Sequence, residues 1–312
     1  MTARLLDVGL VLVVLGMAAW IIVARQTVAA VMGFVAYGLL LSLVWLRLGA
    51  PDVALTEVAI GGGLSGVLML GAAGRLRGVW QPPSEPGFPR RAVAAALSAV
   101  VVVGLVVSLL SLPDPPPTLA LAAAANADAT TIGNPVTNVL MAFRAMDTML
   151  EKVVLLLALI GAWSLAPDRF WGGRPGQCHR ADPNGPLAFL ARVLTPVGIV
   201  VGFYVLWVSA EYPGGAFQGG TLLAAMWLLV MMAGLTDAPP TGRRWVRLIL
   251  IAGPAVFLLV GLGGMLLGDA FLAYPVAWAK PLILAIELAM IVTVAVTLGL
   301  LMAGVPERSA RE

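Results

Sequence analysis

The chain has 312 residues, of which 60% are hydrophobic and only 11% are charged, with a formal net charge of +3. Soluble domains are about 45–50% apolar and about 25% charged, so this composition excludes a soluble protein with one ordinary core. Inside a bilayer every backbone polar group must be satisfied internally, and apolar runs of about 20 residues satisfy this as α-helices. We therefore predict an all-α, polytopic membrane protein.

Nine apolar stretches predict transmembrane helices. The first follows a lone Arg4 and is too long for the apolar region of a typical signal peptide, so we count it as a span. The ninth opens at Pro275 or Pro281 and ends near Ala303. The first eight stretches lie near residues 5–24, 27–46, 52–74, 92–112, 149–166, 187–208, 215–235 and 245–267.

Arginine placement predicts the orientation. Most loop arginines follow the third, fifth, seventh and ninth helices, which end on one side when nine spans are counted, whereas Arg47 lies on the other side. By the positive-inside rule the arginine-rich side is cytoplasmic, so the N-terminus is expected outside and the C-terminus inside. Topology thus explains the net charge, and no nucleic-acid partner is expected. The arginines on the expected cytoplasmic side are Arg75, Arg77, Arg90, Arg91, Arg169, Arg174, Arg180, Arg243, Arg244, Arg308 and Arg311.

Breaks in composition divide the chain into three modules. Proline-rich stretches at 81–89 and 113–117 and a polar loop at 171–186 separate the apolar blocks. We predict modules at 1–80 (three helices), 81–186 (two membrane helices and an amphipathic helix) and 187–312 (four helices). Three membrane modules in one chain suggest fused subunits of a larger assembly.

No cofactor, metal or catalytic site is expected. The chain has one cysteine, Cys178, next to its one histidine, His179, and this pair cannot build a zinc or iron–sulfur site or a disulfide framework. A glycine-rich phosphate loop and a Ser/His/Asp set in a plausible context are also absent from the sequence. The chain is therefore not expected to be an enzyme.

Charged residues inside membrane helices cost about 2.5–3.5 kcal/mol at the helix centre and are functional candidates by default. In the third helix, Asp52 follows Pro51 and is expected to cap the helix. Glu57 lies one and a half turns further on and is a candidate for an ion path. The alternative for Glu57 is a buried hydrogen-bonding or interface role.

Glycines follow Glu57 in the same helix. Gly62 and Gly66 form a GxxxG face on which a neighbouring helix can approach closely. The run Gly61 to Gly63 lowers helix stability, so a local bulge is expected there.

A second charged cluster comprises Arg144, Asp147 and Glu151, at spacings i, i+3 and i+7. Asn134 as N-cap and Pro135 in the first turn are expected to start the helix that carries them, with the three charges on one face. One interpretation is a structural ion-pair ladder. The other places Glu151 at membrane depth, as one stop in a chain of titratable groups.

The last helix carries Lys280 and Glu287, seven residues apart and so on one face. Lys152 and Lys280 are the only lysines among 19 basic residues, and both lie at or within predicted spans. A buried lysine can release its proton, whereas arginine stays protonated. Lys280 and Glu287 are therefore candidates for a proton relay, and the alternative is a snorkelling Lys280 with Glu287 as a helix contact.

Three motifs carry a family resemblance. Residues 49–57, GAPDVALTE, resemble the three-helix domain shared by the MbhD subunit of membrane-bound hydrogenases and the C-terminal part of the large Mrp antiporter subunit. Residues 134–140, NPVTNVL, followed by 143–148, FRAMDT, resemble the MbhE module. Residues 213–220, PGGAFQGG, with 284–287, LAIE, are similar to the MrpB (MnhB) family.

This resemblance implies an accessory membrane subunit of a multisubunit Mrp-type Na⁺/H⁺ antiporter in the bacterial cell (inner) membrane. Such a subunit would contribute lateral helices and part of the ion path. The implied partners are large antiporter-like subunits, an MrpC-like subunit and membrane lipid, and Na⁺ and H⁺ are the transported ions. The alternatives are a subunit of a complex I-like redox-driven pump, such as a membrane-bound hydrogenase, and a purely structural scaffold.

The motifs imply roles for particular residues. The ion path would include Glu57, Asp147, Glu151 and Glu287, whereas Lys280 rests on the argument from its own chemistry. Two departures concern the glycine-rich turn, which has Ala216 where a third glycine is usual and has no preceding histidine. No large antiporter domain precedes the first motif, so the main ion channel is expected from partner subunits. The structural motif residues would be Asp52, Gly62, Gly66, Pro213, Gly214, Gly215, Gln218 and Gly219.

The predicted topology can be tested with a reporter fused after Glu312. We expect activity only from a reporter that works on the cytoplasmic side, because nine spans and the arginine distribution place this end inside. A periplasmic reporter that is active at the same position would contradict the assignment.

Overall fold

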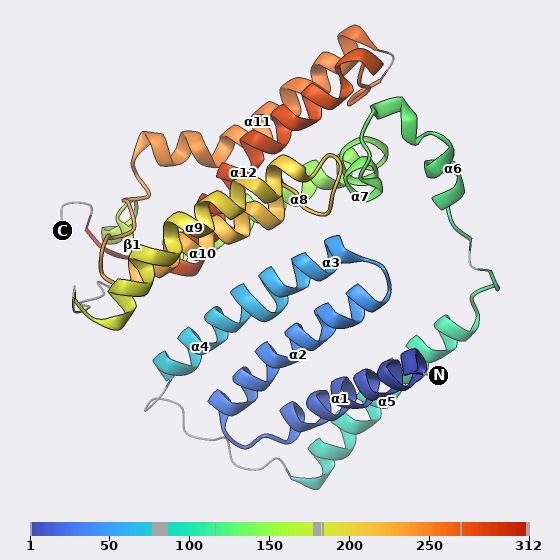
Figure 1. The fold of residues 1–312 in the computed structure, drawn as a ribbon. Coiled ribbons are helices and arrows are strands. Elements are labelled where there is room, and N and C mark those ends of the chain that lie inside the picture. Colours follow the sequence, from blue (N-terminus) through green and yellow to red (C-terminus); the bar gives the residue numbers. More distant parts are fainter. Residues whose placement is uncertain are drawn as a thin grey trace.

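The structure is a computed structural model that describes residues 2–76, 87–115, 117–176, 182, 184–268 and 270–309. Helices make up most of the described chain (Figure 1). The α-helices are α1 (Thr2–Val23), α2 (Thr27–Arg47), α3 (Pro51–Thr56), α4 (Ser65–Leu76), α5 (Phe88–Leu110), α6 (Ala120–Ala125), α7 (Pro135–Asn138), α8 (Ala145–Ser164), α9 (Pro186–Val208), α10 (Ala216–Met232), α11 (Arg244–Leu267) and α12 (Ala279–Ala303). The π-helices are η1 (Glu57–Leu64) and η3 (Val139–Phe143), and the 3₁₀ turns are η2 (Ala127–Thr130), η4 (Asp168–Phe170) and η5 (Val276–Trp278).

The chain is an all-α, multi-pass membrane protein. Seven of its described helices are long and apolar enough to cross a membrane. The remaining two predicted spans are α8 and α10. Helix α8 carries Asp147, Glu151 and Lys152 in its first half, and α10 has only 17 residues, about 25 Å of helix against a hydrocarbon core of about 30 Å. All nine predicted spans are therefore helical. Of the last two, α8 carries charged residues and α10 is shorter than the hydrocarbon core.

Helices α8 to α12 form one packed bundle, in which α12 is the most buried helix. Its side chains Ile283, Ile286 and Ile291 are fully buried, as is Phe257 of α11. Close approach of α9 and α10 depends on Gly219, because a Cβ at that position would come within 2.6 Å of the Gly202 carbonyl oxygen. This bundle is the packed core of the chain.

The N-terminal helices form a second layer, in which α2 packs between α1 and the continuous helix α3–η1–α4. The predicted GxxxG approach is confirmed, since a Cβ on Gly38 of α2 would lie 2.6 Å from the backbone nitrogen of Gly62. A Cβ on Gly66 would collide with Cγ2 of Val35. The predicted bulge is also confirmed, because the helix widens to π geometry over η1.

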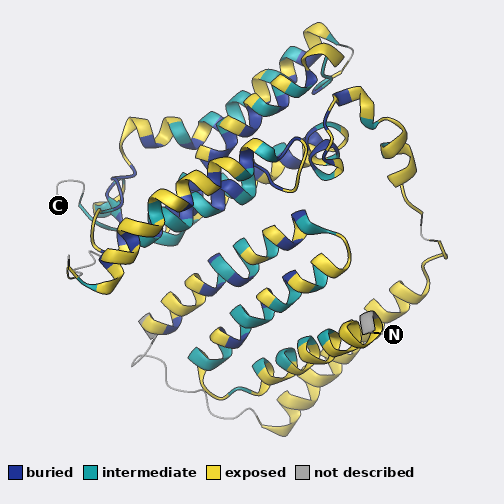
Figure 2. Ribbon diagram, in the orientation of Figure 1, coloured by how far each residue is buried: buried dark blue, intermediate teal, exposed yellow. Residues whose placement is uncertain are grey.

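Two N-terminal helices leave most of their apolar surface uncovered (Figure 2). Helix α5 has no buried residue among its 23, and α1 packs mainly against α2. Such surfaces are compatible with lipid or with neighbouring membrane subunits, because both present apolar groups.

Two short strands, absent from the all-α prediction, close one end of the bundle. Strand β1 (Arg174–Pro175) follows α8 and pairs antiparallel with β2 (Pro306–Arg308), which follows α12. Arg308 also forms a 3.3 Å ion pair with Asp237, which follows α10. The C-terminal ends of α8, α10 and α12 therefore lie together.

This end of the bundle is the one predicted to be cytoplasmic, and its orientation in the membrane stays a prediction. Cys178 and His179 lie outside the described residues, as do Arg77, Arg180 and Arg311.

Packing at Gly38 yields a stability prediction. Gly38→Leu should force α2 away from the π-helix and lower the free energy of unfolding by about 1–3 kcal/mol, as overpacking does in well-packed cores. The measurement is thermal unfolding of the purified protein in detergent. Gly71→Leu in α4 is the matched control, since a Cβ there would meet no atom within 4 Å. Equal losses for the two variants would contradict the packing assignment.

Candidate functional site

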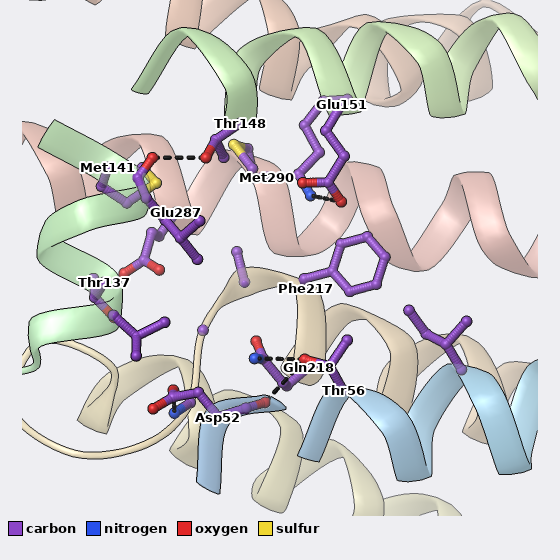
Figure 3. A pocket seen from close by; sticks show the side chains of 17 residues that line it. Asp52, Thr56, Thr137, Met141, Thr148, Glu151, Phe217, Gln218, Glu287 and Met290 are labelled. Atoms are coloured by element: carbon purple, nitrogen blue, oxygen red, sulfur yellow. Dashed lines mark hydrogen bonds and ion pairs between the residues drawn. The ribbon is translucent and has the colours of Figure 1, made fainter. Parts of the chain in front are cut away.

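A cavity of about 220 Å³ lies where all three predicted modules meet (Figure 3). It is bounded by α3, by the segment from α7 to α8, by the start of α10 and by α12. Its polar and charged lining includes Asp52, Thr56, Glu151, Lys152, Gln218 and Glu287. The three sequence motifs, far apart along the chain, therefore supply the walls of one space.

Asp52 joins two of these walls. Its side chain is buried, and its Oδ1 accepts a 2.9 Å hydrogen bond from the backbone N–H of Gly214 and a 3.4 Å bond from Nδ2 of Asn134. The predicted cap was wrong, because the N-cap of α3 is Ala50 and no side chain caps it. The Asp52 carboxylate instead holds the glycine-rich turn before α10 and the start of α7.

Asn134 uses both ends of its amide. Its Oδ1 accepts from the backbone N–H of Val136 at 2.9 Å and of Thr137 at 3.4 Å, which confirms the predicted N-cap. Its Nδ2 also donates to the carbonyl oxygen of Tyr212 at 2.9 Å. Asn134 therefore fixes the helix start against the turn that follows α9.

Glu287 is buried in α12 and is held by neutral donors. Ser209 Oγ donates a 2.7 Å hydrogen bond to its Oε2, and the backbone N–H of Ala216 donates another. Ala216 is the first residue of α10, so the positive end of that helix faces the carboxylate. No ion pair to Glu287 is formed within the described part of the chain.

Gly215 leaves open the space beside Glu287. A Cβ at this position would lie 2.8 Å from Oε1 of Gln218 and 3.6 Å from Oε1 of Glu287. Both oxygens therefore face the same small volume. Gln218 is held in place because its Nε2 donates a 3.1 Å hydrogen bond to Oγ1 of Thr56 on α3.

Lys152 supplies a buried cation. Its side chain is 4% exposed, its Nζ lies 3.1 Å from Oε1 of Glu151, and it sits 4.1 Å from the centroid of the Phe217 ring. Lys152 was not among the predicted path residues. The signal was present in the sequence, however, because Lys152 was one of only two lysines and lay at a predicted span.

The predicted charge cluster divides in two. Arg144 pairs with Asp147 on the exposed surface, whereas Glu151 pairs with Lys152 at the cavity. Arg144 has φ −128° and ψ 33°, so the helix that Asn134 starts is interrupted before α8 begins. The three charges therefore do not form one continuous ladder.

Lys280 does not pair with Glu287. Its Nζ lies 2.5 Å from Oε1 of Glu211, and both side chains are partly exposed. Glu211 was missed by the sequence reasoning, and so was Ser209. Both residues lie in the turn after α9, so this turn is bonded to α12 at two places. A role of Lys280 in ion transfer stays a prediction.

Glu57 lies outside the cavity lining, at the first position of η1. Its carboxylate lies over its own helix, where a Cβ on Gly61 would collide with Oε1. Its role in an ion path, like that of Asp147, stays a prediction. In the described ranges no group of three or more His, Cys, Asp or Glu side chains is placed to hold a metal ion.

Comparison with known proteins identifies two domains. Residues 12–78 match the MbhD family, which is a subunit of MBH. Residues 186–305 match the family MnhB, described as a domain related to the MnhB subunit of Na⁺/H⁺ antiporter.

Two further proteins are similar to this chain. An uncharacterized protein of Methanocaldococcus jannaschii is 26% identical over an alignment of 156 residues, and the match covers 45% of this chain and 60% of that protein. A chain in the structure of the Mrp complex from Dietzia sp. has the same fold, with a TM-score of 0.72 and 22% identity. That match covers 96% of this chain but 35% of the Dietzia chain, so this chain spans less than two thirds of either relative.

The contacts of Asp52 generate a second stability prediction. Asp52→Ala should leave the N–H of Gly214 and one N–H of Asn134 without an acceptor, and hydrogen bonds to charged groups contribute about 1.5–3 kcal/mol each. We expect a lower thermal midpoint of the purified protein. Asp7→Ala, which removes only an exposed ion pair with Arg47, is the control and should have a much smaller effect. Similar midpoints for the two variants would show that Asp52 does not join the modules.

Proposed function

We propose that this chain, which fuses an MbhD domain to an MnhB-related domain, is an accessory membrane subunit of an Mrp-type Na⁺/H⁺ antiporter complex. In this role it contributes lateral helices and part of the proton or sodium path. The observation that carries the proposal is the cavity at the module junction, since it gathers titratable side chains from α8 and α12 in a multi-pass membrane protein.

The depth of these groups supports an ion path. With a rise of 1.5 Å per residue, Lys152 lies about 10 Å from the start of α8, and Glu287 lies about 12 Å from the start of α12. Ionisable side chains at membrane depth are costly and mark proton or ion pathways more often than packing sites. The cavity has room for several water molecules, which could connect such groups.

Other subunits are needed to complete the proposed antiporter complex. The large antiporter-like subunits and an MrpC-like subunit would supply the main channel, with Na⁺ and H⁺ as the exchanged ions and the cell membrane as the location. The uncovered apolar surfaces of α1 and α5 are compatible with neighbouring subunits and lipid. Reconstituted alone in vesicles, the chain should therefore not exchange sodium for protons.

A redox-driven pump is the second candidate, and the match of residues 12–78 to the MbhD family favours it. The two assemblies differ in composition. Purification through a tag on this chain should recover antiporter-type subunits alone if the first proposal holds. Recovery of hydrogenase-type metal subunits would favour the second.

A purely structural scaffold is the third candidate, and Glu287→Gln separates it from a path role. Glutamine keeps the size and an acceptor for Ser209 but cannot titrate, so the complex should assemble normally. Its Na⁺/H⁺ exchange in everted vesicles should fall by about a hundredfold, the usual range for loss of a proton-transfer group. Asp7→Asn on α1 serves as the control and should exchange normally. Normal exchange by Glu287→Gln would remove Glu287 from the path, and loss of assembly would favour the scaffold.

A further inference from the structure

Lys152 is a buried cation that lines the cavity with two carboxylates of very different exposure. Its own side chain is 4% exposed, and its bonded partner Glu151 is 54% exposed. Glu287, which lines the same cavity from α12, is 4% exposed. Glu151 therefore marks the exposed end of the cavity and Glu287 its buried end. Lys152 lines the same cavity.

The ammonium group has unused hydrogen-bonding capacity. A lysine ammonium has three N–H donors. Within the described residues Nζ makes one hydrogen bond, to Glu151, and lies over the face of the Phe217 ring in a cation–π contact. Two N–H donors of Lys152 therefore remain for water, which the cavity is large enough to hold.

Lys152 and Glu287 lie on two helices that pack against each other. Helices α8 and α12 contact each other, and their C-terminal ends meet at the β1–β2 pair, so the two helices run in the same direction. No direct ion pair joins Lys152 to Glu287 among the described residues, so they face one cavity without touching. Water in that cavity could bridge the remaining gap.

Other polar side chains around the cavity already form hydrogen bonds within the protein. Asp52, the charged group that α3 contributes, has its Oδ1 occupied by Gly214 and Asn134. Gln218 on α10 is neutral, and its Nε2 is bonded to Thr56. In the part of the chain that the structure describes, the titratable groups that line the cavity with Lys152 are thus Glu151, Glu287 and Asp52.

We propose that Lys152 transfers protons between Glu287 and Glu151, a step that rests on the proposed function and names the proton as the ion at this cavity. The Lys152 ammonium gives a proton through water to the Glu287 carboxylate, which leaves a neutral amine and a carboxylic acid. Glu151, which takes up a proton at its exposed side, then gives that proton to the amine. Glu151 is thereby a carboxylate again, and Lys152 is an ammonium again. Each transfer breaks one N–H or O–H bond and forms another.

The residue type fits this task. An arginine at this position would hold its proton at every working pH, whereas a lysine can release it. Of the 19 lysines and arginines in this chain, only residues 152 and 280 are lysine, and all the others are arginine. The stacked Phe217 keeps the amine beside the cavity without supplying a competing carboxylate.

Substitutions in the assembled complex test the step. Lys152→Arg keeps the positive charge and the stacking but cannot release a proton, and Lys152→Met removes the charge. Both should assemble at normal levels and lose Na⁺/H⁺ exchange by about a hundredfold, as measured in everted vesicles over a range of pH. Arg47→Lys, which exchanges one cation for another in an exposed ion pair, should leave exchange unchanged.

The other outcomes are decisive as well. Exchange retained by Lys152→Arg would make Lys152 a fixed charge and overturn the transfer step. If only the arginine variant fails to assemble, the pH profile of Lys152→Met decides: a flattened profile of the residual exchange supports the step, and an unchanged shape overturns it. If neither variant assembles, Lys152 is a packing residue and the step is wrong. Exchange that survives deletion of the whole chain would instead contradict the proposed function.

Discussion

Oδ1 of the buried Asp52 carboxylate bonds the N-terminal helices to two later segments of the chain. It accepts hydrogen bonds from the turn before α10 and from the residue that caps α7, so it touches segments 82 and 162 residues away. Asp52 is buried, and leaving a buried donor without a partner is costly. Together with the bond between Gln218 and Thr56, this contact holds α3 beside the start of α10, and both elements line the cavity.

The charged side chains fall into two classes according to their surroundings. Arg144 and Asp147 are 69% and 54% exposed, so the bundle encloses neither side chain of this ion pair. Lys152 and Glu287 are each 4% exposed, and each is held by hydrogen bonds or an aromatic ring rather than by the other. Lys152 pairs with Glu151 and Glu287 is bonded to Ser209, so the two buried groups line one cavity without being paired with each other.

Local features of the fold could be predicted from the sequence, because short-range chemistry determines them. The apolar runs became helices, Asn134 caps α7, and the glycines after Glu57 coincide with a π-helix and a close contact with α2. Periodicity and composition carry this information within one or two turns.

The pairing of charges could not be predicted, because it depends on which segments meet in space. Lys280 and Glu287 lie on one helix, but each bonds to the turn after α9, through Glu211 and Ser209. Asp52 has the sequence context of a helix cap, yet its carboxylate is used by a turn from another module. Spacing along one helix says which side chains share a face and nothing about what that face meets.

The central claim is that this fused chain works inside a cation/proton antiporter, and flux through the purified assembly tests it most directly. The complex would be isolated through a tag on this chain, reconstituted into proteoliposomes and given a sodium gradient, with internal pH followed by a fluorescent dye. The account predicts proton movement opposite to sodium that depends on this chain. Sodium gradients that move no protons through an intact, chain-containing complex would contradict it.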